Sequence, residues 1–294
     1  MLRVTNDGRN PMLIASWNVN SVRTRLEHVL AWLERTQPDL LCLQETKVDA
    51  PLFPAAAFES SGYQLSFHGQ KAYNGVAMLS REPLDDVRKG FIGELAEDDE
   101  ALQLGEQKRV ISALIDGVRV VNLYVPNGSG LTSEKYPYKL RWLACLKRYL
   151  EAARTRDEPL CVVGDFNIAM EPRDIHDPER LSGGIMATDA EREALQQALG
   201  DSMNDVFRVF EPDAGHWSWW DYRSGAWNRD SGWRIDHIYL SDDLLSTARG
   251  CVIDKQERGR EQPSDHAPVV VDLCWPPAEA VSYTHLTLPT ICSV

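Results

Sequence analysis

Strand-like and helix-like segments alternate along almost the whole chain, from Leu13 to Leu273, and no low-complexity linker separates them. Short apolar runs predict buried strands at residues 13–17, 39–45, 75–80, 160–166, 235–241 and 268–274. The runs at 109–115 and 118–124 are joined by Asp116-Gly117, the strongest short-range signal for a β-hairpin. A purely parallel doubly wound sheet would not use a hairpin there. The pattern therefore predicts mixed sheets, in a sandwich of two sheets covered by helices.

Three amphipathic helices are predicted between these strands. The first is capped by Asn20 or Ser21 and ends before Pro38, with an apolar face formed by Val22, Leu26, Val29, Leu30 and Leu33. A second helix covers about residues 139–153. Thr188 and Glu191 form a capping box at the start of the third.

The length of 294 residues fits one large α/β domain, which we expect to span residues 12–275. Residues 1–11 lack apolar periodicity and are expected to be a disordered lead-in rather than a secretory signal. Residues 276–294 form a tail, and its uncharged end at 281–294 resembles a translated sequencing adapter more than native protein.

The cysteines and the lengths of the apolar runs bear on the cellular compartment of the protein. Its 6 cysteines form no CxxC pair, which argues against a structural zinc site or a disulfide framework and favours a reducing compartment. No apolar run approaches the roughly 20 residues of a membrane span. We therefore expect a cytoplasmic protein with no membrane partner.

The net charge of −13 at first opposes a nucleic-acid partner, because neutralising phosphates requires Lys and Arg. A local basic face can coexist with an acidic body, however, and a site for divalent cations needs carboxylates of its own. The charge alone therefore leaves the partner open.

Four predicted strands consist mainly of apolar residues and end directly at an acidic or amide residue. These polar ends are Asn18 with Asn20, Glu45, Asp165 with Asn167, and Asp236. A fifth polar pair, Asp265 and His266, precedes the last strand. Taken singly, each could be a turn or cap residue. Ligand sites of layered α/β folds collect at strand ends, so together these residues predict a shared site, provided that the ends meet.

These residue types suit the hydrolysis of a phosphate ester, which needs a cation, an activated water and fixed donors around the phosphate. Glu45 offers the hard oxygen ligands that suit Mg²⁺ or Mn²⁺ rather than zinc. Asp165 can accept a proton from a water or orient it, and His266 with Asp236 can form a dyad. Further donors are available from Asn18, Asn167, Tyr124 and Asn127.

Seven motifs then match one family in its own order, between about Ile14 and Asp272. They are SWNVNSVR at 16–23, LCLQETK at 41–47, NLYVPNG at 122–128, VVGDFNIA at 162–169, HWSWWDYRS at 216–224, GWRIDHIYLS at 232–241 and SDHAPVVVD at 264–272. The chain resembles the exonuclease III type of abasic-site endonucleases, within the DNase I-like endonuclease/exonuclease/phosphatase superfamily. GDFN with SDHAP marks the superfamily, and SWWDYRS with GWRID narrows it to the DNA-repair branch.

The resemblance implies a four-layer α/β sandwich, two mixed β-sheets flanked by helices, and a role for each matched position. Glu45 would be the main metal ligand, with Asn20 and Asp265 nearby, and the metal would be Mg²⁺, which Mn²⁺ could replace. Asp165 would activate water and Asn18 would orient Asp165, beside the dyad of Asp236 and His266. Which of Asp165 and the dyad removes the proton stays open.

The resemblance also implies how DNA would be held. Asn127, Asn167 and Tyr124 would contact the phosphate. Trp219 and Trp233 would be the walls of a pocket for the flipped abasic sugar, whereas core packing is expected for Trp220. Arg223 is the favoured DNA contact among the candidates, which are Arg23, Arg25, Lys47, Lys71, Arg223, Arg229 and Arg234. The loop at 128–130 lacks the large basic residue of some relatives, and the segment 173–185, with Asp174 and His176, receives no role.

The implied activity is hydrolysis of the phosphodiester 5′ to abasic sites, with 3′→5′ exonuclease and 3′-phosphoesterase activity. The partner would be double-stranded DNA with abasic sites or blocked 3′ ends, bound by a monomer that associates with the nucleoid in a prokaryote. One alternative is a phosphatase or phosphodiesterase of the superfamily that acts on a non-DNA substrate, without SWWDYRS and GWRID. Another is a non-catalytic nucleic-acid-binding relative, which would have lost residues such as Glu45, Asp165 or His266.

Overall fold

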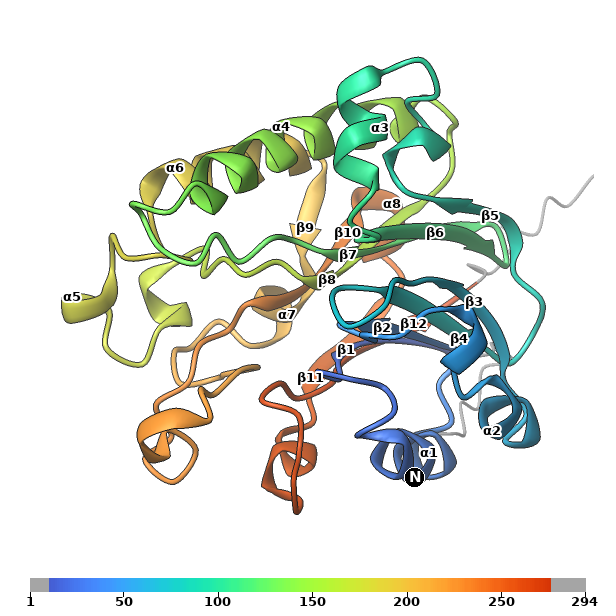
Figure 1. The fold of residues 1–294 in the computed structure, drawn as a ribbon, viewed down its shortest axis with the longest axis horizontal. Coiled ribbons are helices and arrows are strands. Elements are labelled where there is room, and N and C mark those ends of the chain that lie inside the picture. The colour runs from blue at the N-terminus through green and yellow to red at the C-terminus, as the bar shows by residue number, and fades with distance from the viewer. Residues whose placement is uncertain (1–10, 276–294) are drawn as a thin grey trace, which may run out of the picture.

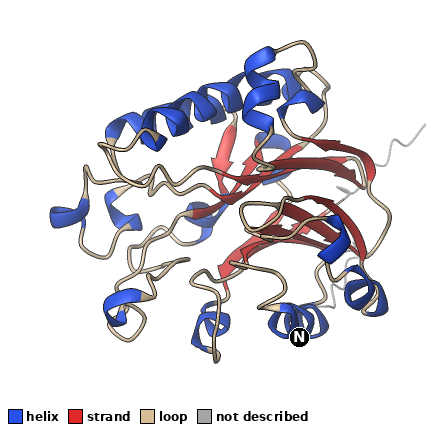
Figure 2. Ribbon diagram, in the orientation of Figure 1, coloured by secondary structure: helices blue, strands red, loops and turns tan. Residues whose placement is uncertain are grey.

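Two six-stranded sheets pack face to face in the computed structural model, which describes residues 11–275 (Figures 1 and 2). The first sheet has the order β11-β12-β1-β2-β4-β3. Its strands are β1 (Pro11–Asn18), β2 (Leu40–Gln44), β3 (Gln64–His68), β4 (Val76–Ser80), β11 (Ala248–Ile253) and β12 (Val269–Cys274). Only β1 and β2 run parallel within it, and the other neighbours are antiparallel.

The second sheet repeats this plan with the order β5-β6-β7-β8-β10-β9. Its strands are β5 (Asp85–Lys89), β6 (Val110–Ile115), β7 (Val118–Tyr124), β8 (Leu160–Asp165), β9 (Met203–Asp205) and β10 (Asp236–Ser241). The central pair, β7 and β8, is the parallel one. The hairpin between β6 and β7 turns at Asp116 and Gly117, whose positive φ angles of 47° and 81° suit the tight turn that was predicted.

Helices cover the outer face of each sheet and complete four layers, as Figure 1 shows. Helices α1 (Leu26–Thr36) and α2 (Ala55–Ser60) pack on the first sheet, and α3 (Asp99–Gly105), α4 (Lys135–Arg154) and α6 (Asp189–Leu199) on the second. The short helices α5 (Pro178–Leu181), α7 (Val206–Phe210) and α8 (Asp242–Leu245) lie in connections. Between the sheets, the apolar side chains of both inner faces form one core. The predicted mixed sandwich is confirmed.

Two predictions about local structure are wrong or incomplete. Helix α1 begins at Leu26, and its N-cap residue Arg25 makes no capping hydrogen bond with its side chain. Asn20 and Ser21 are not its N-cap: Ser21 Oγ accepts from the Thr24 N–H at 3.4 Å in the turn before the helix, and both residues have left-handed φ angles, of 44° and 92°. The sequence patterns also missed four strands, β3, β5, β9 and β11, which lie at the edges of the sheets.

The chain ends bear on the predicted domain limits. Pro11 already pairs with Cys274 in the first sheet, so β1 begins inside the predicted lead-in. The rest of that lead-in, residues 1–10, and the predicted tail at 276–294 lie outside the described residues. Within residues 11–275, none of the helices has the length and apolar character that crossing a membrane requires.

Candidate active site

The central strands of both sheets deliver their polar ends to one place. Carboxyl ends of parallel strands meet at the same edge of a sheet, and the parallel pairs here are β1 with β2 and β7 with β8. Hydrogen bonds join the two edges: Asn18 on β1 donates to Asp165 on β8, and Tyr124 on β7 donates to Glu45 just after β2. Asp236, the first residue of β10, is the register partner of Asp165. The predicted strand ends therefore converge.

Glu45 accepts hydrogen bonds from both sheets. Its Oε1 accepts from the Tyr124 hydroxyl at 2.7 Å and from Asn18 Nδ2 at 3.1 Å, while its Oε2 lies 2.8 Å from Lys47 Nζ. Burial raises the pKa of the Glu45 carboxyl, but Lys47 and the donors outweigh burial and hold the pKa below its ordinary value. Burial and the charge of Glu45 raise the pKa of Tyr124 well above its ordinary value. Glu45 is thus an anion at neutral pH, and Tyr124 a hydroxyl donor.

The ammonium group of Lys47 marks a position that favours a cation. It lies 2.8 Å from Glu45 Oε2 and also donates to Asn20 Oδ1, so these two oxygens face one point. Asn20 Nδ2 donates to Asp265 Oδ1 at 2.9 Å, and Trp219 Nε1 holds the other oxygen of Asp265 at 3.0 Å. Asn20, Glu45 and Lys47 all have positive φ angles, a strained conformation that collects at functional sites. The three predicted metal residues therefore lie together.

Asp165 is buried and is held by the asparagines beside it. Its Oδ2 accepts from Asn18 Nδ2 at 2.9 Å and from Asn167 Nδ2 at 3.2 Å, and its Oδ1 accepts from the Asn167 backbone N–H at 2.9 Å. His266 Nε2 lies 3.8 Å from Oδ2. Burial raises the pKa of Asp165 above its ordinary value, against the opposing effect of His266. A carboxylate in this position can take a proton from water or orient it.

Asp236 and His266 form the predicted dyad. Nδ1 of His266 lies 2.8 Å and 3.1 Å from the two carboxylate oxygens of Asp236. Burial lowers the pKa of His266, but the carboxylates of Asp236 and Asp165 outweigh it and raise the pKa to about 10. The ring therefore carries a positive charge next to Asp165.

Two serines in the site were not predicted. Ser218 Oγ donates to Asp236 Oδ2 at 2.6 Å and accepts from the Asp236 backbone N–H at 3.0 Å, which fixes the carboxylate. Ser264 Oγ donates to the Asn18 carbonyl at 2.6 Å and accepts from the His266 N–H at 3.2 Å. Both lie inside the motifs HWSWWDYRS and SDHAPVVVD, so membership of a family motif was the available signal.

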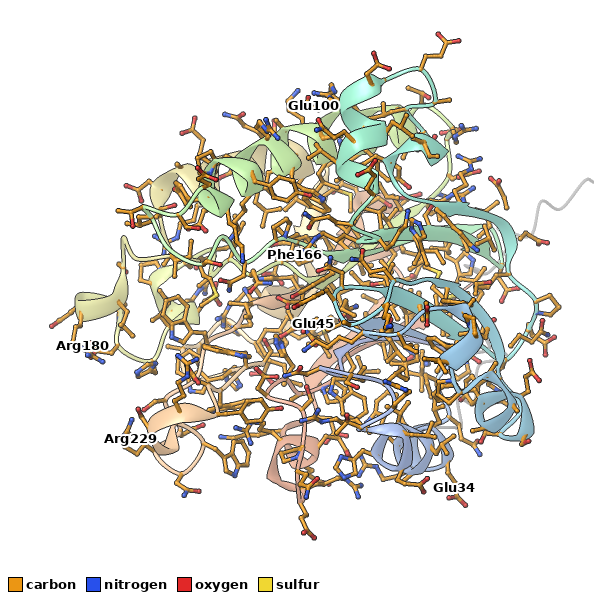
Figure 3. All side chains as sticks on the ribbon, in the orientation of Figure 1. Glu34, Glu45, Glu100, Phe166, Arg180 and Arg229 are labelled. Atoms are coloured by element: carbon orange, nitrogen blue, oxygen red, sulfur yellow. The ribbon has the colours of Figure 1, made fainter. Side chains whose placement is uncertain are left out.

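A cavity of about 390 Å³ opens beside Trp219 and Trp233, whose backbones pair with each other. Its rim carries cationic groups, among them Arg180, Arg223 and Arg229. Figure 3 shows Arg180 and Arg229 projecting at one side of the molecule, while Glu45 lies between the two sheets. The predicted pocket walls therefore line a real hollow. Trp220 is fully buried, which confirms the core role expected for it.

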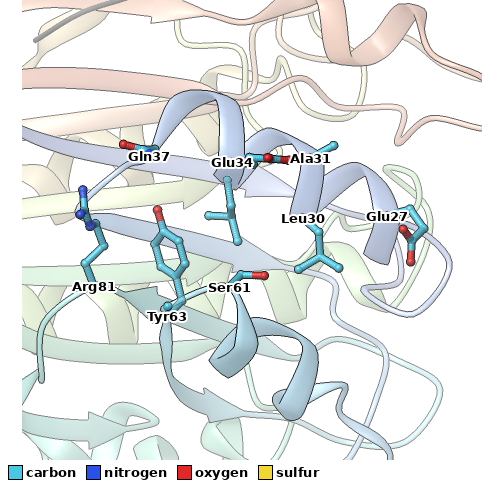
Figure 4. A pocket seen from close by; sticks show the side chains of 10 residues that line it. Glu27, Leu30, Ala31, Glu34, Gln37, Ser61, Tyr63 and Arg81 are labelled. Atoms are coloured by element: carbon cyan, nitrogen blue, oxygen red, sulfur yellow. The ribbon is translucent and has the colours of Figure 1, made fainter.

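A second hollow, of about 550 Å³, lies between α1 and the turn after α2 on the outer side of the first sheet (Figure 4). Side chains such as Glu27, Glu34, Tyr63 and Arg81 line it. It contains none of the acids and amides at the strand ends, so we assign it no part in the site.

The prediction that Arg234 contacts DNA is wrong, because its side chain is 1% exposed and is paired with two carboxylates. Its Nε lies 2.7 Å from Asp174 Oδ1, and its Nη2 lies 2.7 Å from Asp205 Oδ2. Arg208 also pairs with Asp174. Asp174, which had no role from sequence, is thus the centre of a buried ion cluster behind Trp233.

Replacing Arg234 by Met should lower the free energy of unfolding by about 3–5 kcal/mol, because it leaves buried carboxylates without a partner. Denaturant unfolding measures this change. Arg223→Gln is the control, since an exposed arginine without a described ion pair should change stability by about 0.5 kcal/mol or less. Equal stability of the two variants would contradict a buried ion cluster.

Comparisons with known proteins identify relatives of the whole described chain. A family model described as the Endonuclease/Exonuclease/phosphatase family matches residues 15–266. Exodeoxyribonuclease III of Haemophilus influenzae is 36% identical over 270 residues, which cover 88% of this chain and 98% of that protein. The DNA repair nuclease APEX1 of Danio rerio is 34% identical over 278 residues, which cover 92% and 84%.

Solved structures give the same result. The 3′ phosphatase NExo from Neisseria, bound to a product DNA hairpin, is 39% identical with a TM-score of 0.84, covering 90% of this chain and 100% of that one. An AP endonuclease from Archaeoglobus fulgidus is 38% identical with a TM-score of 0.83, covering 89% and 99%.

The chain belongs to the endonuclease/exonuclease/phosphatase family. Within that family its relatives are exodeoxyribonucleases and AP endonucleases, which confirms the predicted resemblance and makes the chain a nuclease-type hydrolase.

Proposed function

We propose that this nuclease hydrolyses the phosphodiester bond 5′ to abasic sites in double-stranded DNA and trims blocked 3′ ends. The observation that carries the proposal is one network across the two sheets, in which hydrogen bonds join Glu45, Asn18 and Asp165, and a charge contact of 3.8 Å joins Asp165 to the Asp236–His266 dyad. Apart from Ser218 and Ser264, the residues of the candidate site are those for which the family resemblance implied a role. We therefore assign Asp165 to the activation of water, the Asp236–His266 dyad to the phosphate, and Glu45 to the binding of the metal.

The residues around Glu45 fit a magnesium ion. Glu45 Oε2 and Asn20 Oδ1 already converge on a positive charge, and both are the hard oxygen donors that Mg²⁺ prefers. Asp165, Asp236 and His266 also present three possible ligand atoms within 4.8 Å of one another. The close pairing of Asp236 with His266 makes that second position the poorer one. A bound Mg²⁺ would neutralise charge that develops on the phosphate oxygens.

The side chains of the site divide the chemistry between them. Asp165, held by Asn18 and Asn167, takes the proton of the attacking water, which settles on its carboxylate. His266, fixed by Asp236, presents its positive charge to the phosphate. Tyr124 has one O–H hydrogen, which turns from Glu45 Oε1 to the same phosphate when the substrate binds. The water oxygen bonds to phosphorus, the bond from phosphorus to the 3′ oxygen breaks, and the departing 3′ alkoxide takes a proton from solvent water to become a 3′ hydroxyl.

The distribution of cations supports a local DNA face on an acidic protein. Many arginines of the described chain are neutralised by carboxylates, as Arg35, Arg88 and Arg156 are. Four exposed candidates have no ion pair among the described residues: Arg23, Lys71, Arg223 and Arg229. Arg223 and Arg229 also line the cavity beside Trp219 and Trp233, called here the tryptophan pocket. Unpaired cations are the ones free to contact phosphates. Lys47, which pairs with Glu45, serves the metal site instead.

Replacing Trp219 by Ala should reduce the preference for abasic over intact duplex by about tenfold, since the pocket loses one wall. Incision rates on the two duplexes measure the ratio. Trp219→Phe separates the two roles of this side chain, because it keeps an aromatic wall but loses the hydrogen bond to Asp265. A preference that survives in Trp219→Ala would show that the ring does not select the substrate.

The proposal extends to the state of the protein. We assign the catalytic unit to a single domain over residues 12–275, acting as a monomer in the compartment that holds the DNA. The experiment that tests the function is incision of a duplex with one tetrahydrofuran abasic analogue, with and without a chelator. Cutting 5′ to the analogue only when Mg²⁺ is present is expected. Turnover of a small phosphate ester without any DNA cutting would favour the phosphatase alternative instead.

A further inference from the structure

Lys139 and Glu191 form an ion pair that is fully enclosed by protein, and the chemistry described above does not use it. Both side chains have an exposure of 0%, and Lys139 Nζ lies 2.6 Å from Glu191 Oε1. Burying two charges is costly, and replacing such a pair by apolar residues is often neutral or stabilising. Stability alone therefore does not explain why this ion pair is buried here, and the other contacts of the two side chains indicate a further role.

Lys139 ties together the two loops that carry the asparagines of the site. Its Nζ donates to the Asn167 carbonyl at 2.7 Å and to the Asn127 carbonyl at 3.3 Å. These loops follow the parallel strands β7 and β8, and their side chains meet where Asn127 Nδ2 donates to Asn167 Oδ1 at 2.9 Å. Asn167 in turn holds Asp165. One ammonium group on α4 thus sets the spacing of both loops.

Glu191 extends the tie to the pocket wall. Its Oε1 also accepts from the Met186 backbone N–H at 3.1 Å, and its Oε2 accepts from the Thr188 N–H at 3.0 Å. Met186 lines the tryptophan pocket. The close packing here leaves little room, because a Cβ added at Gly128 would lie 2.9 Å from Ile185 and 3.3 Å from Lys139. Three loops of the site therefore depend on one buried pair.

We infer that Lys139 and Glu191 are positioning residues for the phosphate. They hold the loops that carry Asn127, Asn167 and Met186 at the relative positions that catalysis requires. This inference rests on the proposed function. Fixed donors act only when they are held at the right place, and a displacement of about 1 Å far from the chemistry can cost about a hundredfold in rate. Neither residue touches the substrate, so binding of DNA does not depend on the pair directly.

The test uses the double variant Lys139→Met with Glu191→Gln, which removes both charges together and leaves no lone buried ion. The matched control is Arg119→Met with Glu158→Gln. Arg119 is also buried and pairs with Glu158 at 2.9 Å, and it lies at the opposite end of β7 from Tyr124. Its second partner, Asp86, keeps an ion pair with Arg88 in the control. The conservative variant Lys139→Arg keeps the charge and should lose less activity than the double variant. All variants are compared by thermal unfolding before any rate is measured.

The double variant should cut the abasic duplex at least about tenfold more slowly in a single turnover. Its Kd for DNA should change by less than about threefold, because no exposed cation is removed. Hydrogen exchange at the backbone amides of residues 127–129, 166–169 and 186 should become faster in this variant and not in the control. A folded double variant with wild-type rate and exchange, or a control that loses as much activity, would overturn the inference. If the wild type itself does not cut, the proposed function fails. The hydrogen-exchange rates of the three loops then test by themselves whether the pair positions them.

Discussion

Replacing Asp165 by Asn should slow incision at an abasic site by about a thousandfold or more, with little change in the affinity for DNA. Proton transfer by a positioned side chain typically contributes about 10²- to 10⁴-fold to a rate. The amide keeps the size of the carboxylate but cannot accept a proton. It also presents an N–H group where Asn18 and Asn167 donate, so the orientation of the site is disturbed as well. Single-turnover rates and DNA titrations separate the two effects.

The control for this variant is Asp272→Asn. Asp272 lies on β12 and pairs with Arg249 at the surface, away from the strand ends of the site. Because surface ion pairs contribute little, this variant should keep both its stability and its rate. Cutting by Asp165→Asn at the rate of the wild type would refute the assignment of Asp165 to the water.

Replacing Glu45 by Gln should raise the Mg²⁺ concentration that gives half-maximal activity by more than about tenfold. The change removes the anionic ligand at the centre of the proposed metal site, and even residues that only support a ligand typically cost about 10- to 100-fold in metal affinity. It also removes the partner of Lys47, so a direct measurement of metal binding is needed beside the rate. Calorimetric titration of the DNA-free protein with Mn²⁺ provides that measurement.

Glu34→Gln is the matched control for the metal. Glu34 is an exposed carboxylate on α1, where it lines the hollow away from the site. It should leave Mn²⁺ binding and the Mg²⁺ requirement unchanged. Unaltered binding in Glu45→Gln would move the metal to another position, for which Asp165, Asp236 and His266 are the alternative.

The strand ends of the site could be predicted because an apolar run that stops at an acid or amide is a local pattern. Their convergence could not be predicted from that pattern. It depends on the bonds from Asn18 to Asp165 and from Tyr124 to Glu45, which cross between sheets and join residues far apart in the chain. Only the family resemblance supplied that information. The serines that fix the dyad were missed because a lone serine has no distinctive pattern.

Arg234 shows why charge type alone does not locate a DNA contact. Its neighbours Trp233 and Asp236 belong to the site, but its own side chain points to Asp174, 60 residues earlier in the chain. The predicted cap at Asn20 failed for a related reason, because that side chain is engaged by Asp265 and Lys47. The edge strand β5 was missed because its residues are mostly exposed and polar, so no buried run marks it.

Incision of a tetrahydrofuran-containing duplex in ¹⁸O-labelled water, under single-turnover conditions with Mg²⁺, shows which atom the water attacks and which bond breaks. We expect one ¹⁸O atom in the 5′-phosphate that carries the abasic analogue, and an unlabelled 3′-hydroxyl on the other fragment, as mass spectrometry would show. This result follows from attack of water on phosphorus with departure of the 3′ oxygen. Label in the 3′-hydroxyl, a 3′-phosphate product, or an intact duplex would contradict it.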